Sequence, residues 1–135
     1  DDKFLRSRIR KLLVNLDKEG LKFNKFYLTL KNLSKSDQVI EFYVDKNILE
    51  NSKYFEKDKK IILNQSFFNN PEEIILRSIM QVIKRISWKK NYPRGKKVNI
   101  LINSIKFSNK NVKLTLSGCI IEKIQDSVII YPEKR

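Results

Sequence analysis

The apolar residues of the first twenty positions repeat with the period of an α-helix. They recur at intervals that place them on one face: Leu5, Ile9, Leu12, Leu13 and Leu16. Asp1 and Asp2 suit the N-cap and the positive end of the helix dipole, and Gly20 suits the position just beyond the C-terminus. The pattern predicts a helix over residues 3–19.

The next segment, residues 21–70, contains neither glycine nor proline. Its apolar positions keep helical spacing up to about residue 48, which predicts one long helix, or two helices with a break near Ser36. Aromatic residues lie on this apolar stripe and not among the lysines. We therefore expect them to pack in the core and not to stack on nucleic-acid bases. The stripe consists of Phe23, Phe26, Tyr27, Leu30 and Leu33, then Val39, Ile40, Tyr43, Val44 and Ile48.

Residues 53–64 change character, because two short apolar stretches flank a charged turn at residues 57–60. This arrangement predicts two short strands. A well-marked helix follows, with Asn70 as N-cap, Pro71 at the first helical position and Glu73 three residues after the cap. Its apolar face is formed by Ile75, Ile79, Val82, Ile83 and Ile86.

The last third of the chain predicts a helix and then a sheet. A shorter helix begins at Pro93, and residues 111–131 alternate between apolar and polar with turns near residues 117–118 and 125–127. We expect an α+β fold that is mostly helical, with a short hairpin near 53–64 and a small antiparallel C-terminal sheet. We expect two domains, 1–52 and 53–135, and we assign Trp88 to the core.

The charge of the chain points to a polyanionic partner. Lys and Arg number 29 against 15 Asp and Glu in 135 residues, a net charge of +14. Ile, Lys and Asn together supply 53 residues, which suggests an AT-rich genome and weakens the meaning of each lysine. Codon bias does not explain the excess over acids, because Asp and Glu also have A-containing codons. Nucleic acid is the favoured partner, and a basic protein-binding module is the alternative.

Composition excludes several kinds of chemistry. The chain has no His and one Cys, which excludes a His-based triad, a disulfide framework and a Cys-cluster zinc site. Three Gly cannot form a phosphate-binding loop. We expect no catalytic residues and no metal ligands here, and Cys119 reads as a small buried hydrophobe. Apolar runs fall short of the roughly 18 residues of a membrane span, so we expect a cytoplasmic protein without membrane contact.

The strongest candidate binding residues are the arginines of the first helix. Arg6, Arg8 and Arg10 lie within five positions of a chain that otherwise prefers lysine, and Lys11 follows them. Guanidinium groups stay charged and bind phosphate through two parallel hydrogen bonds. We therefore predict contacts with phosphates or bases at these four residues.

A second set of candidates lies at and after the third helix. Arg94, Lys96 and Lys97 crowd the first turn of the helix near residue 95, where each cation opposes the helix dipole at a cost of about 0.3–1 kcal/mol. A bound phosphate would offset this cost. Arg77 and Lys84 complete the predicted RNA-binding residues.

Three segments carry motifs in an order that matches one enzyme family. The opening DKFLRSRIRKLLVNLD holds the cluster Arg6-Ser7-Arg8-Ile9-Arg10. The middle carries Glu73, Ile74, Arg77, Pro93 and Arg94, and the closing LSGCIIEKIQDSVIIYPEKR carries Gly118, Cys119, Glu133 and Arg135. Together these segments resemble the part of tRNA(Ile)-lysidine synthases that follows the nucleotide-binding core. Ser117 replaces a usual glycine of that family, and Ser7 a usual asparagine.

The resemblance implies a function for the parent protein. A tRNA(Ile)-lysidine synthase is a ligase that activates the wobble cytidine of isoleucine tRNA with ATP and magnesium and joins free lysine to it. No segment here matches the family's N-terminal ATP-pyrophosphatase loop, and the chain starts at Asp1 without Met, so we expect a fragment without cofactors of its own. Residues 1–52 would then be the tail of the catalytic domain and a linker, and 53–135 a tRNA-binding region for isoleucine tRNA with a CAU anticodon.

Two other functions stay open on the sequence. A stand-alone basic RNA-binding module without catalytic activity fits the same charge pattern, and so does a protein-interaction domain whose lysines reflect genome composition. The oligomeric state is also open, a homodimer being one alternative. Roles of Cys119 and Trp88 other than packing are not assigned.

Overall fold

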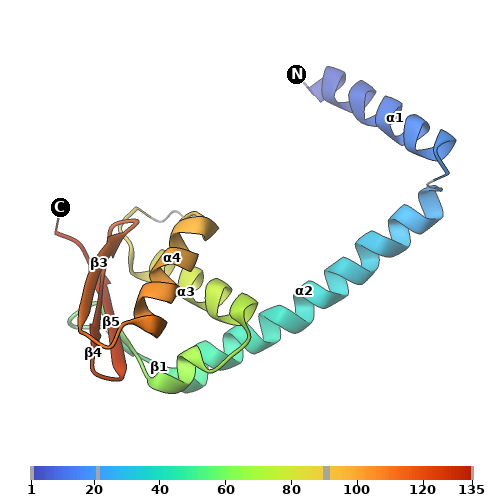
Figure 1. Ribbon diagram of the computed structural model, residues 1–135. Coiled ribbons are helices and arrows are strands. Elements are labelled where there is room, and N and C mark those ends of the chain that lie inside the picture. Colours follow the sequence, from blue (N-terminus) through green and yellow to red (C-terminus); the bar gives the residue numbers. More distant parts are fainter. Residues whose placement is uncertain (1, 21, 90–91, 135) are drawn as a thin grey trace. The chain divides into compact units, whose positions relative to one another are not determined.

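The computed structural model describes residues 2–20, 22–89 and 92–134. Within these residues it has an α+β fold, which confirms the predicted class (Figure 1). In chain order the elements are α1 (Asp2–Lys18), α2 (Phe23–Asn51), β1 (Ser52–Phe55), β2 (Lys60–Leu63), the 3-10 helix η1 (Gln65–Phe68), α3 (Glu72–Ile86), α4 (Gly95–Phe107), β3 (Val112–Leu116), β4 (Cys119–Ile124) and β5 (Ser127–Pro132).

The chain divides into two compact units, Asp1–Val39 and Ile40–Arg135. The first holds α1 and the N-terminal part of α2. The second holds the rest of α2, the other helices and all strands. The assignment of residues 1–52 and 53–135 to separate domains stays a prediction. No helix in the part of the chain that the structure describes combines the length and apolarity needed to cross a bilayer.

In the first unit, α1 forms where the apolar period predicts it. Gly20 follows the helix with φ +95°, and its N–H donates to the Asp17 carbonyl oxygen at 3.0 Å, so glycine is required at this C-terminal turn. The predicted caps, Asp1 and Asp2, lie outside the described side chains. The apolar stripe is not buried, since Leu12 is 60% exposed. Within its unit, α1 is an amphipathic helix with an uncovered apolar face.

Of the two alternatives left open by the sequence, the structure has the single long helix, α2, which continues through Ser36 without a break. Placing its aromatics in the core was wrong for the N-terminal half and also for Tyr43, which is 49% exposed. Tyr27 is 57% exposed, Leu33 is 58% exposed and Phe26 is half-buried, while the side chain of Phe23 lies outside the described residues. Periodicity identifies residues that share a face, but another element must cover that face before it becomes core.

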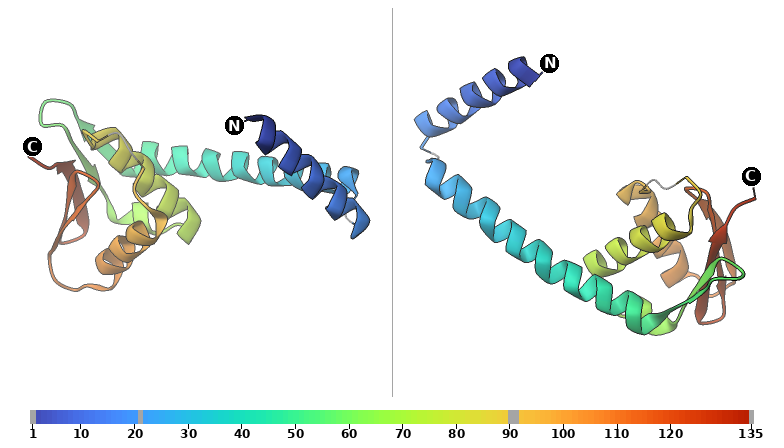
Figure 2. Two further views of the ribbon diagram at one scale, coloured as in Figure 1. Left: turned by 90° about the horizontal axis from the view of Figure 1, so that it is seen from above. Right: turned by 180° about the vertical axis from the view of Figure 1, so that it is seen from behind.

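The C-terminal unit is built on one antiparallel sheet of five strands in the order β1-β2-β5-β4-β3. Figure 2 shows the ribbon of this unit from two further sides. The predicted hairpin is β1–β2, and the predicted meander is β3–β4–β5. They join because β2 pairs with β5, with Ile61 opposite Ile130 and Leu63 opposite Val128. The strand order therefore connects residues near position 60 with residues near position 130.

Helices α3 and α4 cover one face of this sheet and form the core with it (Figure 1). The core is rich in isoleucine because β-branched side chains pack well on a pleated surface, and α3 presents its apolar stripe to that surface. Its members include Ile61, Leu63, Phe67, Ile75, Ile79, Ile83, Ile86, Val98, Leu101, Cys119, Ile121, Val128 and Ile130.

The start of α3 differs from the prediction. Pro71 is the N-cap residue, and its carbonyl oxygen accepts from the N–H groups of Ile74 and Ile75. Asn70 does not cap the helix, because its amide donates to the Asn47 side-chain oxygen at 3.1 Å and to carbonyl oxygens of η1. Asn47 is buried and also donates to Ser78 Oγ at 3.2 Å. Asparagine 70 thus joins α2 to the η1 segment.

Helix α4 begins at Gly95, two residues after the predicted start, with Arg94 as its N-cap residue. At its other end, Lys123 Nζ donates to the carbonyl oxygens of Ile105 at 2.7 Å and Ser108 at 2.8 Å. An ammonium group at this position satisfies acceptors that the helix leaves unpaired and complements the negative end of its dipole. Strand β4 therefore fixes the C-terminus of α4.

Candidate nucleic-acid interface

Four predicted binding residues lie on α1 in the first unit. The side chains of Arg6, Arg8, Arg10 and Lys11 are all exposed. Their spacing distributes them on both flanks of the uncovered apolar stripe. Helix α1 therefore offers guanidinium groups to a ligand, and whether they bind phosphate stays a prediction.

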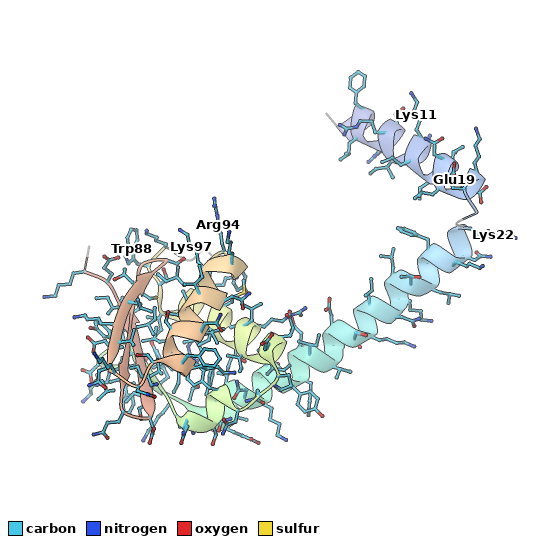
Figure 3. All side chains as sticks on the ribbon, viewed as in Figure 1. Lys11, Glu19, Lys22, Trp88, Arg94 and Lys97 are labelled. Atoms are coloured by element: carbon cyan, nitrogen blue, oxygen red, sulfur yellow. The ribbon has the colours of Figure 1, made fainter. Side chains whose placement is uncertain are left out.

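The second unit concentrates cations where α3 ends and α4 begins, a region we call the basic end. It consists of the exposed residues Lys84, Lys89, Arg94, Lys96 and Lys97 with the neighbouring aromatics Trp88 and Tyr92. Figure 3 shows Trp88, Arg94 and Lys97 at this end of the unit. The chain from position 84 to position 97 has no acidic residue. Four predicted residues, Lys84, Arg94, Lys96 and Lys97, thus belong to one surface region.

Exposed aromatic rings accompany these cations. Lys84 Nζ lies 4.2 Å from the ring centroid of Tyr92, and Lys89 Nζ lies 5.4 Å from that of Trp88. Such contacts contribute about 0.5–1 kcal/mol at exposed sites. Unlike a salt bridge with a carboxylate, a ring contact restrains the ammonium group without neutralising its charge. These two ring contacts therefore leave the positive charges of Lys84 and Lys89 in place.

Trp88 is not a core residue, which corrects the prediction. Its side chain is 38% exposed. Its indole lies against a tight turn between β3 and β4, where Ser117 and Gly118 both have positive φ, at +49° and +81°. A Cβ atom at Gly118 would lie 3.3 Å from Trp88 Nε1 and 3.0 Å from Ser87 Oγ. The indole therefore rests on the backbone of the turn at the surface.

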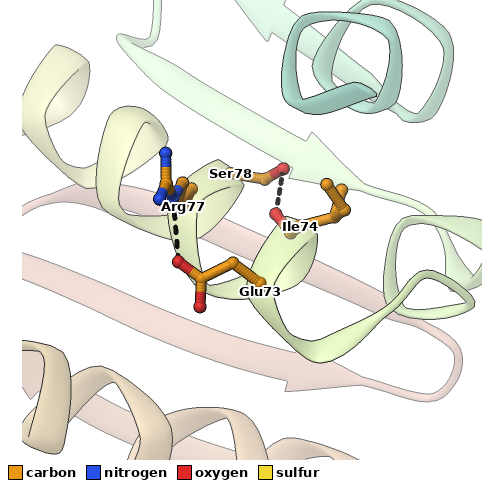
Figure 4. A network of polar contacts seen from close by, with 4 residues as sticks. All are labelled: Glu73, Ile74, Arg77 and Ser78. Atoms are coloured by element: carbon orange, nitrogen blue, oxygen red, sulfur yellow. Dashed lines mark hydrogen bonds and ion pairs between the residues drawn. The ribbon is translucent and has the colours of Figure 1, made fainter. Parts of the chain in front are cut away.

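Arg77 lines a pocket together with Tyr92 of the basic end, but its charge is paired with a carboxylate. Its Nε donates to Glu73 Oε1 at 2.8 Å within α3, one turn earlier, and the neighbouring Ser78 hydroxyl donates to the Ile74 carbonyl oxygen (Figure 4). The Arg77 side chain is 32% exposed. Its charge is balanced by a carboxylate, so it suits helix stabilisation better than phosphate binding.

Sequence reasoning missed Lys89 and the two aromatics as interface residues. The signal was present in the acid-free stretch 84–97, in which aromatic residues alternate with cations. The period of α3 suggested burial for Trp88, but α3 ends at Ile86, and Ser87 is already extended. A residue beyond the helix end no longer follows the helix face.

The chemistry of Cys119 is that of a buried side chain. Its thiol is fully buried at the start of β4 and donates to the Ile83 carbonyl oxygen at 3.6 Å. Burial raises the pKa of Cys119 to about 11, so the thiol stays protonated at neutral pH. Among residues 2–20, 22–89 and 92–134, no three His, Cys, Asp or Glu side chains gather as potential metal ligands.

Comparison with protein-family models, with curated proteins and with solved structures finds no match to this chain.

Proposed function

We propose that this chain is the tRNA-binding portion of a tRNA(Ile)-lysidine synthase, the ATP-dependent ligase that attaches lysine to the wobble cytidine of isoleucine tRNA in the cytoplasm. The observation that carries the proposal is the basic end, where cations and exposed aromatics meet without a nearby run of acids. The motif resemblance supplies the identity of the RNA. ATP, magnesium and free lysine would act at residues of the parent enzyme outside this chain.

The chemistry of the basic end supports an RNA ligand in particular. Lysine and arginine groups on a surface release counterions when they neutralise phosphates, which favours binding to any polynucleotide. Exposed aromatic rings beside them suit unpaired bases, which folded RNA offers and duplex DNA does not. The arginines of α1 would add contacts nearer the anticodon.

A competition titration tests the proposal. Isoleucine tRNA with an unmodified CAU anticodon is bound to the 135-residue chain, and methionine tRNA with the same anticodon and a DNA duplex compete for it. We expect a preference for the isoleucine tRNA that is lost in the variant Arg6→Ala/Arg10→Ala. The matched variant Lys57→Ala/Lys110→Ala, which removes the same charge elsewhere, should keep the preference.

Two outcomes would replace the proposal. Equal binding of all three nucleic acids would assign the chain to stand-alone basic modules. Absence of binding to any of them would leave a protein-interaction domain whose lysines reflect genome composition.

A further inference from the structure

A groove adjoins the basic end, between α4 and the turn that connects β3 with β4. Its volume is about 400 Å³, within the range of roughly 300–1,000 Å³ typical of small-molecule sites. It combines an apolar floor with a charged rim. The lining residues are Lys89, Lys97, Ile100, Leu101, Ser104, Leu114, Thr115, Leu116, Ser117, Gly118 and Glu133.

The floor of the groove is apolar and partly open to solvent. Leu114 and Leu116 of β3 are half-buried, and Ile100 of α4 is 59% exposed. These aliphatic side chains are in contact with water, and a flat ring that covers them lowers the free energy by removing apolar surface from water. A nucleobase has the shape and the apolar faces to do so.

Two lysines place positive charge at the rim. Lys89 and Lys97 both line the groove, and they come from different segments, one after α3 and the other in the first turn of α4. The stem of Lys89 crosses the turn so closely that a Cβ atom at Gly118 would lie 3.4 Å from its Cγ. Glycine at this position thus permits the close approach of the Lys89 stem to the turn, and the Lys89 ammonium group lies 5.4 Å from the ring centroid of Trp88. The pair suits the phosphate of a single nucleotide.

An acidic residue, Glu133, also lines this groove. Glu133 is fixed beside the turn because its backbone N–H donates to the Gly118 carbonyl oxygen at 2.9 Å. An ionised carboxylate only accepts hydrogen bonds, and its two oxygens match two adjacent donors. Among the four RNA bases, guanine alone presents two adjacent donors, N1–H and N2–H, on its Watson–Crick edge.

We propose that this groove binds one unpaired guanine nucleotide of RNA. The base covers the apolar floor, Glu133 accepts from N1–H and N2–H, and Lys89 and Lys97 hold the phosphate. This inference rests on the proposed RNA-binding function and deepens it, because it assigns base recognition to a site that phosphate contacts alone would not require.

Trp88 gives a direct readout, because it is the one tryptophan of the sequence and lies against Gly118 at the edge of the groove. The probes are the single-stranded RNAs UUGUU, UUAUU, UUCUU and UUUUU, added to the 135-residue chain. Binding is followed by Trp88 fluorescence and by the anisotropy of a labelled strand. We expect UUGUU to bind about fivefold or more tighter than the other three and to change Trp88 emission.

Two variants test base recognition and phosphate binding separately. Glu133→Gln replaces one acceptor oxygen by a donor amide and should abolish the preference for UUGUU while weak binding of all strands persists. Lys89→Ala/Lys97→Ala should weaken all four strands, whereas the charge-matched Lys57→Ala/Lys110→Ala should weaken them less.

Four results would overturn the inference. Equal affinities for the four strands would remove the preference for guanine, and binding by anisotropy with unchanged Trp88 emission would place RNA outside the groove. Both results leave the tRNA proposal standing. Saturable quenching by an acidic peptide but not by RNA would assign the groove to a protein ligand. If neither the strands nor tRNA bind, the proposed function fails with the inference.

Discussion

At the residue scale, Cys119 shows how position decides chemistry. A thiol without a neighbouring base and without solvent contact is a packing group, and its proton is held by the low polarity around it. Asn47 is a buried polar residue whose hydrogen bonds are all made inside the protein. Its amide nitrogen donates to Ser78 Oγ and the Phe67 carbonyl oxygen, and its amide oxygen accepts from the side chains of Asn51 and Asn70. Among the described side chains, no buried nitrogen or oxygen lacks a hydrogen-bond partner.

The raised pKa of Cys119 makes stability depend on alkaline pH. The folded state keeps its proton up to about pH 11, whereas the unfolded thiol ionises near 9.0. The protonated thiol therefore stabilises the folded state fully below pH 9. As pH rises toward 11, this stabilisation of roughly 2–3 kcal/mol is lost. Urea unfolding of the wild type and of Cys119→Ala between pH 7 and 11 measures it. The difference in unfolding free energy between the wild type and Cys119→Ala should become smaller as pH rises. A difference that stays constant would contradict the raised pKa of Cys119.

At the element scale, the helices depend on partners to different degrees. Helix α3 buries a stripe of isoleucines against the sheet, and α4 is fixed at its C-terminus by Lys123 of β4. Helix α1 has an equally regular period, but its stripe stays exposed within its unit. The period of a sequence predicts an amphipathic helix equally well in both cases.

Replacement of Lys123 tests the link between α4 and β4. Lys123→Met keeps the aliphatic stem but leaves the carbonyl oxygens of Ile105 and Ser108 without their ammonium donor. We expect a loss of about 1–2 kcal/mol in unfolding free energy, seen as a lower urea midpoint with an unchanged slope. Lys110→Met, at an exposed residue in the loop after α4, should change stability by less than about 0.5 kcal/mol. Equal effects of the two variants would argue against the cap.

At the scale of the whole molecule, the types of the main elements were predictable and their tertiary environment was not. Period 3.6 and period 2 identified the helices and the meander, because local sequence decides which residues share a face. The pairing of β2 with β5 joins segments about 70 residues apart in the chain and leaves no local signal. For the same reason the sequence placed Tyr27 and Trp88 in a core that does not cover them.

The candidate site was predictable in part. Lys84, Arg94, Lys96 and Lys97 were identified from charge and helix position, and the structure gathers them at the basic end. Lys89 and Glu133 acquire a shared groove only through the β3–β4 turn, whose glycine allows close approach. No spacing in the sequence brings positions 89 and 133 together.

The most direct test of RNA binding at the basic end is a salt series with isoleucine tRNA. Wild type, Arg94→Ala/Lys96→Ala/Lys97→Ala and the charge-matched Lys57→Ala/Lys106→Ala/Lys110→Ala are titrated at several salt concentrations. We predict a wild-type slope of log K against log salt of roughly −3 to −4.5, reduced in magnitude by about 2–3 in the basic-end variant and nearly unchanged in the matched one. Equal slopes for the two variants, or affinity that does not respond to salt, would contradict the assignment of RNA binding to this surface.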